Sequence, residues 1–363
     1  MATSFALDVR AVPHAPMQDL DPRKIEFGRI FTPTWLSCEY RNGKWGTPVI
    51  DDLKNISLHR AAIVLHYGQA IFEGLKAHRF EDGSINLFRP ERNARRFNQS
   101  ARRMSMPEVD ETLFVEGIKQ LINDQREWVP GYPGSLYIRP AMIGTEPCIG
   151  VRASTDFTFF VLTLPSGAYF PQTSGAVGAG SVRVYLTTSV GRAAVGGTGN
   201  VKAAANYAVT LQVIAEAKKR EVPCSQVLFL DSRGTGRVEE MGGMNVFFLV
   251  DGQWITPRLT GTMLAGVTRD SILQMSKDIG VPAVEGDLTL DELIAGVQSG
   301  KISEAFACGT AATIVGISEF QVENGPTLRF DPSPGPVTSK FYKSLIELQY
   351  GQRPDPYGWI QRI

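Results

Sequence analysis

Cysteine and histidine are scarce in this chain, which has only four of each among 363 residues. The cysteines (Cys38, Cys148, Cys224 and Cys308) are widely spaced and form no C-x-x-C pair, and the histidines form no H-E-x-x-H motif. Neither a disulfide framework nor a metal site is therefore predicted. Scattered cysteines are typical of proteins in a reducing compartment, so a cytoplasmic location is predicted.

The chain also lacks an excess of either charge. It has 37 basic and 37 acidic residues, so its formal net charge is zero, and neither nucleic acid nor a membrane is predicted as a partner. No apolar run approaches the roughly 20 residues of a membrane span, and no signal-peptide pattern is found near the N-terminus. The motifs of serine hydrolases (G-x-S-x-G) and P-loop NTPases (G-x-x-x-x-G-K-[ST]) are missing too, which argues against both classes.

The length suits about two or three domains of common size, and the composition indicates a globular protein. The content of 43% hydrophobic and 20% charged residues is ordinary for such proteins. A stretch rich in glycine, proline and serine predicts an interdomain linker at residues 171–181, between domains at 1–170 and 182–363. Strand and helix patterns mix without a regular β-α-β alternation, so an α+β fold is predicted rather than a doubly wound sheet.

A loop of small residues that ends at Lys202 is the first candidate for chemistry. Gly196, Gly197 and Gly199 suit a backbone that approaches a ligand closely, and three alanines follow the lysine. No acidic residue lies within ten positions of Lys202, so no sequence neighbour can pair with its ammonium group. Lysine acts as a nucleophile and base when its surroundings disfavour its charged form. The alternative is a surface lysine that opens a helix over residues 203–220.

Three later stretches contain groups that could bind charged parts of a ligand. Glu239 and Glu240 precede a Gly-Gly turn, and one of them could face a cofactor nitrogen, although a solvated pair is the alternative. Gly266 precedes a predicted helix, whose free N–H groups and dipole favour an anion. The turn at residues 309–312 offers N–H groups and the Thr310 hydroxyl to a phosphate or a carboxylate. An ordinary helix start and a plain hairpin turn are the alternatives for these last two.

Two arginines also stand out in the first half of the chain. Arg139 and Tyr137 flank Ile138 in an apparent strand, so they share one face of that strand. If this face is internal, the pair could bind a carboxylate. Arg96 lies in an arginine-rich helix predicted over residues 90–104, where a solvated face is the usual interpretation.

A lysine nucleophile, a carboxylate and several anion-binding turns are what a pyridoxal phosphate (PLP) enzyme requires. The sequence resembles the branched-chain amino-acid aminotransferases, which are PLP enzymes of fold type IV, from about Phe27 to Trp359. Several specific motifs in the same order carry this resemblance. They are Leu65-His66-Tyr67 with Phe72-Glu73-Gly74-Leu75-Lys76, Ser135-Leu136-Tyr137-Ile138-Arg139-Pro140, Gly167-Ala168-Tyr169-Phe170, Gly199-Asn200 with Lys202 and Asn206-Tyr207, Glu240 with Gly242-Gly243-Met244-Asn245, and Gly309-Thr310-Ala311.

The resemblance implies a two-domain fold-type IV enzyme that uses PLP as its cofactor. Lys202 would bond to PLP covalently and would also move the proton between substrate and cofactor. Glu240 would keep the pyridinium nitrogen protonated, and Tyr207 would lie next to the 3′-oxygen. The groups implied for the phosphate are the Arg96 side chain, the Val267 and Thr268 backbone amides and the Thr310 hydroxyl.

The resemblance also implies the reaction, a reversible transfer of the amino group of L-leucine, L-isoleucine or L-valine to 2-oxoglutarate. The products are branched 2-oxo acids and L-glutamate. Tyr137 and the Thr310 and Ala311 amides would hold the α-carboxylate, and Arg139 would pair with the distal carboxylate of glutamate. An apolar pocket would take the aliphatic chain, with two residues from the second subunit of a homodimer, Tyr67 and Val151. The pocket residues implied are Phe31, Tyr67, Val151 and Tyr169.

The sequence departs from the family at two places. Animal members carry a C-x-x-C pair just after the Gly-Thr-Ala turn, where this chain has Ala312 and Val315, so that thiol switch is not expected. Many relatives have Gly-Gly where this chain has Ala204-Ala205, which could shift the following helix against the cofactor.

Other functions on the same fold are a D-amino-acid aminotransferase and a PLP lyase of the aminodeoxychorismate type. A PLP-binding regulatory protein without turnover is a third possibility. Glu240, Arg139 and Tyr137 argue against it, because cofactor storage needs no site for a substrate carboxylate.

Overall fold

The structure is a computed structural model that describes residues 6–11, 21–22, 24–167 and 179–363. Its contacts divide the chain into two compact units. One unit comprises Met1–Tyr169, Lys202–Ala204 and Leu348–Ile363, and the other comprises Phe170–Val201 and Ala205–Glu347. Most of the predicted linker lies outside the described residues, so the domain boundaries stay a prediction.

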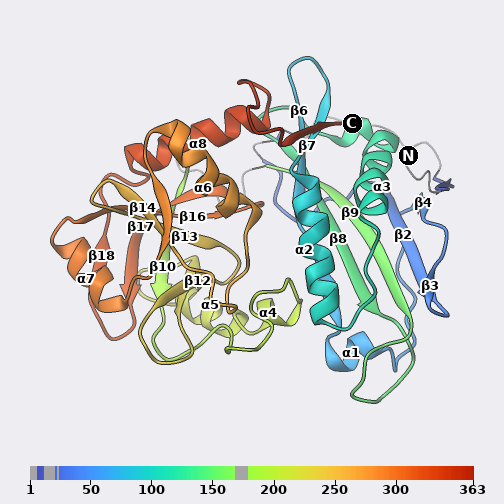
Figure 1. Ribbon diagram of the computed structural model, residues 1–363, viewed down its shortest axis with the longest axis horizontal. Helices are drawn as coiled ribbons and strands as arrows, with labels where there is room; N and C mark the ends of the chain where they lie inside the picture. Colours follow the sequence, from blue (N-terminus) through green and yellow to red (C-terminus); the bar gives the residue numbers. More distant parts are fainter. Residues whose placement is uncertain (1–5, 12–20, 23, 168–178) are drawn as a thin grey trace. The chain divides into compact units, whose positions relative to one another are not determined.

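The first unit is built on one ten-stranded sheet, in which all described pairings except β1 with β4 are antiparallel (Figure 1). The order along the sheet is β1 (Asp8–Val9), β4 (Val49–Asp52), β2 (Thr34–Arg41), β9 (Phe157–Ser166), β8 (Ser135–Gly144), β6 (Leu75–Arg79), β7 (Ile85–Phe88) and β19 (Ile360–Arg362). Two short strands pair outside this path, β3 (Lys44–Trp45) with β2 and β5 (Ala70–Phe72) with β8.

Two helices of the first unit are α2 (Pro90–Arg103) and α3 (Glu111–Asp124). Their apolar side chains pack with those of the sheet in one hydrophobic core. The helix predicted over 90–104 is confirmed to within one residue. Asp110 caps α3 by accepting hydrogen bonds from the N–H groups of Thr112 and Leu113 at 2.9 and 3.0 Å. Two short helices complete the unit, α1 (Ile63–Tyr67) and a 3₁₀ turn (Arg126–Trp128).

The second unit contains a nine-stranded sheet in which parallel and antiparallel pairs are mixed. The order is β12 (Val238–Met241), β11 (Gln226–Leu230), β10 (Ser181–Leu186), β17 (Thr313–Val322), β16 (Ile302–Gly309), β13 (Asn245–Val250), β14 (Gln253–Pro257) and β15 (Ala283–Gly286), with β18 (Thr327–Arg329) on β17. Antiparallel pairs predominate in the first sheet and outnumber parallel pairs in the second, and the helices follow no repeated β-α-β order, which confirms the predicted α+β class.

The helix predicted over residues 203–220 is confirmed in part, because this segment is helical but is divided into two shorter helices, α4 (Ala205–Ala208) and α5 (Leu211–Lys218). The Thr210 hydroxyl donates to the Tyr207 carbonyl at 2.8 Å, and this local bond competes with a continuous helical ladder. The other helices are α6 (Val267–Ile279), α7 (Leu290–Gln298) and α8 (Pro336–Gln349). Within the described ranges, no helix is long and apolar enough to cross a membrane.

Candidate active site

Lys202 belongs to a three-residue segment that extends the first unit's sheet beside β5. The Phe72 N–H donates to the Lys202 carbonyl at 3.1 Å, and the Ala204 N–H donates to the Ala70 carbonyl at 3.0 Å. The Lys202 N–H donates to the Ser100 hydroxyl at 3.0 Å. The position of this lysine is therefore fixed by backbone contacts with residues that lie far earlier in the sequence.

The Lys202 side chain is half-buried, and its Nζ lies 4.9 Å from the centre of the Phe72 ring. An acidic residue also lies near it: the Lys202 charge helps to lower the pKa of Glu73. The local sequence contains no acidic residue near Lys202, but in the folded chain Glu73 lies near its ammonium group.

Glu73 is fully buried and is paired with Arg96 by two hydrogen bonds. Arg96 Nε donates to Oε1 at 2.6 Å and Nη2 donates to Oε2 at 2.8 Å, while Asn93 Nδ2 donates to Oε2 at 2.8 Å. Burial on its own raises the pKa of Glu73, but Arg96, Lys202 and Asn93 together hold this pKa below its ordinary value. A solvated position for Arg96 is wrong, because its side chain is only 8% exposed.

Tyr137 and Arg139 lie on the same face of β8, as predicted. Arg139 Nη2 donates to the Tyr137 hydroxyl at 3.0 Å, and the guanidinium carbon lies 4.6 Å from the centre of the Phe72 ring. Tyr137 is buried and Arg139 is half-buried. The hydroxyl lies so close to Gly74 that a Cβ there would be 2.1 Å away, so this contact requires glycine. The arrangement presents a phenol and a guanidinium together beside an aromatic ring.

Lys76, the last residue of the motif that begins at Phe72, is a buried cation in this part of the sheet. It pairs with Tyr137 across β6 and β8, so the two side chains share one face. Burial lowers the pKa of Lys76 from 10.5 to about 8.

The depressed pKa of Lys76 predicts how stability depends on pH. Between about pH 8 and 10.5 the unfolded chain holds this proton more tightly than the folded protein. The free energy of unfolding should therefore rise with pH there, by up to about 1.4 kcal/mol per pH unit. We expect Lys76→Met to lack this contribution, as measured by denaturant unfolding at pH 7.5, 8.5 and 9.5. Exposed Lys44→Met is the control, and parallel curves for wild type and Lys76→Met would contradict the prediction.

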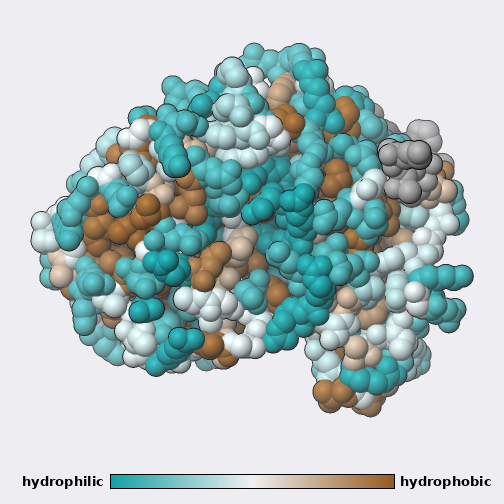
Figure 2. All heavy atoms as spheres, in the orientation of Figure 1, coloured by the Kyte–Doolittle hydropathy of each residue, from teal (hydrophilic) through white to brown (hydrophobic). Residues whose placement is uncertain are grey.

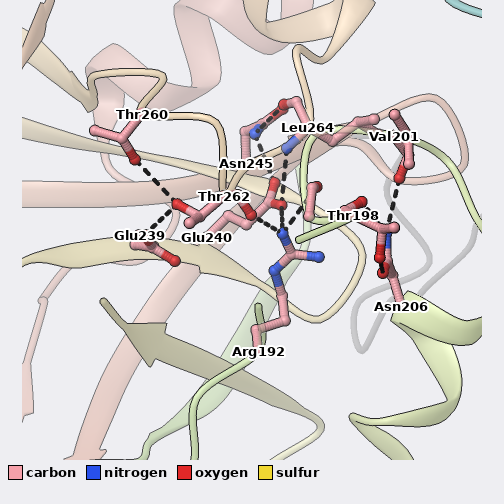
Figure 3. Close-up of polar contacts among 11 residues, drawn as sticks. Arg192, Thr198, Val201, Asn206, Glu239, Glu240, Asn245, Thr260, Thr262 and Leu264 are labelled. Atoms are coloured by element: carbon pink, nitrogen blue, oxygen red, sulfur yellow. Dashed lines mark hydrogen bonds and ion pairs between the residues drawn. The ribbon is translucent and has the colours of Figure 1, made fainter. Parts of the chain in front are cut away.

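Glu240 is the centre of a buried polar network in the second unit (Figure 3). Arg192 Nη2 lies 2.7 Å from Oε1, and the Leu264 N–H donates to the same oxygen at 2.9 Å. Asn245 Nδ2 donates to Oε2 at 2.9 Å. The side chains of Arg192 and Glu240 are only 4% and 5% exposed, so this carboxylate is held in a single orientation away from water. The solvated pair that was the alternative for Glu239 and Glu240 is wrong.

Arg192 is a site residue that sequence reasoning missed. Besides pairing with Glu240, its Nη2 donates to the Gly199 carbonyl at 3.1 Å and to the Thr262 carbonyl. A Cβ at Gly199 would lie 2.2 Å from the Thr262 oxygen, so glycine permits this close approach. An arginine in a stretch of small residues could have indicated a buried charge, but the partners of Arg192 are distant in sequence and could not be inferred.

The loop before Lys202 is also fixed from its other side, by Asn206. The Asn206 side chain donates to the Thr198 and Val201 carbonyls at 2.6 and 2.8 Å (Figure 3). Its Oδ1 accepts from the Thr198 hydroxyl at 2.8 Å. The glycine-rich loop is thus an ordered element rather than a loose connection.

The predicted anion-binding turns lie close to the Glu240 network within the second unit. Asn245 on β13 is paired with Cys308 on β16, directly before the 309–311 turn. A Cβ on Gly266 would lie 2.1 Å from Asn245 Oδ1. The start of α6 and the 309–311 turn therefore both lie near Asn245. No side chain among the described residues caps α6 at Gly266. Its first N–H groups therefore suit a phosphate.

Tyr207 also belongs to this group, because its ring lies against Gly243. Together with the buried Glu240 carboxylate and the uncapped start of α6, the Tyr207 phenol is a group that could hold PLP. The structure thus brings together the predicted residues of the second unit. They are Tyr207, Glu240, Val267, Thr268, Thr310 and Ala311.

The apolar pocket stays a prediction, because it would include Tyr67 and Val151 from a second copy of the chain. Phe31 and Tyr67 are 44% and 41% exposed, Val151 is 91% exposed, and Tyr169 lies outside the described residues. Tyr67 ends α1, and Val151 lies in the loop after β8, which is joined to the start of α1 by the bridge between Ala62 and Pro147. Figure 2 shows hydrophobic surface on this loop.

Comparisons with known proteins identify the family of this chain. Residues 70–320 match the family model of amino-transferase class IV. The chain is 39% identical over 345 residues to branched-chain-amino-acid transaminase 1 of Bacillus subtilis, covering 94% of this chain and 95% of that protein. It is 42% identical over 344 residues to the branched-chain-amino-acid aminotransferase of Mycolicibacterium smegmatis, covering 93% and 92%.

The fold is similar to that of solved aminotransferases. The branched-chain amino acid aminotransferase of Thermobaculum terrenum in its PLP form has a TM-score of 0.71 and 22% identity, with 90% of this chain and 97% of that chain covered. The Escherichia coli enzyme has a TM-score of 0.69 and 24% identity, covering 89% and 98%. These similarities confirm the predicted fold-type IV architecture. The chain therefore belongs to the class IV amino-transferases, and within them to the branched-chain-amino-acid aminotransferases.

Proposed function

We propose that the protein transfers the amino group of L-leucine, L-isoleucine or L-valine reversibly to 2-oxoglutarate. The observation that carries this proposal is the Arg139–Tyr137 pair on β8, which faces the Phe72 ring together with Lys202. A guanidinium beside an aromatic ring suits both a distal carboxylate and an aliphatic chain. One site can therefore serve glutamate and leucine in turn.

We also propose PLP as the cofactor, bonded to Lys202. When bound, PLP supplies an electron sink for the negative charge that develops at the substrate Cα. The uncapped start of α6 and the buried Glu240 carboxylate support this proposal. Solved relatives are described in a PLP form and with pyridoxamine 5′-phosphate, which supports it further. The proposed phosphate ligands are Arg96, Val267, Thr268 and Thr310, with Tyr207 beside the ring oxygen.

Each residue of the proposed site then has a defined task. The Lys202 amine takes the proton from the substrate Cα and returns it on the cofactor side, as a general base and acid. Glu240 stays oriented by Arg192, Asn245 and Leu264 and holds the proton on the ring nitrogen. The Tyr137 hydroxyl and the amides of the 310–311 turn orient the α-carboxylate, and Arg139 selects the distal carboxylate of glutamate.

A homodimer is proposed as the active assembly, because α1 and the loop after β8 expose apolar side chains. Leu65, Tyr67, Ile149 and Val151 are 58%, 41%, 70% and 91% exposed. The loop is held by the Arg152–Glu146 ion pair, so its apolar residues are presented on an ordered backbone. A second copy of the chain would cover them, and a cytoplasmic location is proposed for the assembly.

A panel of amino donors with 2-oxoglutarate tests the function. We expect L-leucine, L-isoleucine and L-valine to react at rates within about tenfold of one another, because a buried methylene contributes only about 0.8 kcal/mol. Turnover of D-alanine would instead favour a D-amino-acid aminotransferase. Release of pyruvate from a chorismate-derived substrate would favour the lyase.

Replacing Arg139 with alanine tests dual substrate recognition. We expect kcat/KM to fall by about 10- to 100-fold with L-glutamate, the usual cost of removing a charge-assisted hydrogen bond. The fall with L-leucine should be much smaller, because leucine has no distal carboxylate. Equal losses with the two donors would mean that Arg139 has a structural role only.

A further inference from the structure

Helix α2 of the first unit carries three buried polar side chains on one face. Asn93, Arg96 and Ser100 have the spacing i, i+3, i+7, which places residues on the same side of a helix. Asn93 and Arg96 both bind Glu73. Ser100 makes a different contact, because its Oγ accepts a hydrogen bond from the Lys202 N–H at 3.0 Å. This helix face thus contains a proposed phosphate ligand and an anchor for Lys202.

The other side of the Lys202 backbone is held by β5. The Phe72 N–H donates to the Lys202 carbonyl at 3.1 Å, and the antiparallel bridge between Ile71 and Ala203 continues this pairing. The N–H and the carbonyl of Lys202 are therefore bonded to two different elements, α2 and β5. Because both hydrogen-bonding groups of this backbone are occupied, the point from which the side chain starts is fixed. From there the amine reaches the Phe72 ring, 4.9 Å from its centre.

Gln69 joins these two elements to each other. It directly precedes β5 and is buried, and its Nε2 donates to the Met104 carbonyl just after α2 at 2.9 Å and to the Ser105 carbonyl at 3.3 Å. Its Oε1 accepts from the Ser154 N–H at 3.0 Å, so the amide itself is held in place. The helix and the strand that bind Lys202 therefore cannot move apart without breaking buried hydrogen bonds, which is unfavourable.

We propose that Ser100 is a positioning residue for Lys202. Its hydroxyl sets the position of the lysine backbone relative to α2, and so the distance over which the amine moves a proton. This inference rests on the proposed function, in which Lys202 carries that proton. Displacing a reacting group by about 1 Å can lower a rate about 10²-fold. Ser100 has no part in the proposed substrate contacts of Tyr137 and Arg139, so substrate binding should be spared.

Steady-state kinetics of the Ser100→Ala holoenzyme with L-leucine and 2-oxoglutarate test the proposal. Alanine favours a helix more than serine does, so α2 should persist. We expect kcat to fall about tenfold or more while KM stays within about twofold, because the lost contact acts on the reacting group and not on substrate binding. Ser276→Ala is the matched control, since this serine is also buried in a helix but donates within it, to the Leu273 carbonyl at 2.8 Å. The control should keep both constants.

Hydrogen exchange of the Lys202 amide provides a readout that does not require activity. It is measured by mass spectrometry on a peptide that spans residue 202, and loss of one hydrogen bond should make this exchange about two- to tenfold faster in Ser100→Ala. Ser100→Cys is a second variant, because a thiol fills the place of the hydroxyl but accepts a hydrogen bond only weakly. It should lower kcat in the same direction.

Unchanged exchange of the Lys202 amide, or faster exchange with a normal kcat, would overturn the positioning role of Ser100. A normal kcat in Ser100→Cys would overturn it as well, because only side-chain volume would then matter at this position. A wild-type protein that does not transaminate L-leucine would instead contradict the proposed function. The exchange measurement would in that case still show whether Ser100 holds the Lys202 backbone.

Discussion

Lys202→Ala is expected to abolish transamination of L-leucine while leaving the fold intact. The variant loses both the covalent attachment point and the proposed proton carrier. A general acid–base residue alone contributes about 10²- to 10⁴-fold to the rate, so kcat should fall by at least this factor. The absorbance of cofactor bonded to lysine should disappear as well. Normal activity in this variant would exclude the proposed mechanism.

The structure explains why this loss should not come from unfolding. The contacts that fix residue 202 to Ser100 and Phe72 use its backbone N–H and carbonyl, which alanine retains. The midpoint of thermal unfolding should therefore remain close to that of the wild type. Added methylamine should restore part of the activity, because the missing group is an amine. Lys44→Ala, which removes an exposed lysine from the first unit, is the matched control.

The sequence predicted those elements whose signals are local. The helix predicted over residues 90–104 is confirmed to within one residue, and the shared face of Tyr137 and Arg139 follows from strand alternation. The helix expected at 203–220 is interrupted between α4 and α5, where the Thr210 hydroxyl donates to the Tyr207 carbonyl and competes with the helical ladder. Propensity alone does not reveal such competition.

The surroundings of the key side chains depend on contacts between distant segments, which no local pattern contains. The acid near Lys202 is Glu73, and the base that holds Glu240 is Arg192. The sequence contains Glu73 and Arg192, but it does not show which residues they contact, because those contacts form only when the strands pair and the loops fold. The roles of Tyr67 and Val151 came from the family resemblance alone, and in one copy of the chain both are exposed.

A large loss of stability is expected for Glu73→Ala. The substitution leaves the Arg96 guanidinium, which is 8% exposed, without its buried carboxylate. Breaking a buried ion pair from one side costs about 3–5 kcal/mol, because the remaining charge is desolvated and uncompensated. Denaturant unfolding at pH 7 measures this difference. Glu108→Ala is the control, since it removes an exposed pair with Arg102 of the same helix, which contributes at most about 1 kcal/mol.

The pH dependence of the Glu73→Ala effect distinguishes a charge effect from a loss of packing. The pKa of Glu73 is lowered in the folded state, so its contribution is complete above the ordinary value of 4.5 and is lost only as the pH falls through the lowered value. The difference from wild type should therefore persist at pH 5 and shrink on stronger acidification. A difference that stays constant at low pH would point to packing.

Replacing both partners separates the stabilising role of the pair from the proposed role of Arg96 in binding phosphate. Glu73→Leu with Arg96→Met fills similar volume without charge, so it should recover much of the stability that Glu73→Ala loses. If Arg96 also binds the PLP phosphate, the double variant should still bind PLP more weakly than wild type, as measured by titration of the apoprotein. Recovery of both stability and PLP affinity would show that Arg96 serves only to neutralise Glu73.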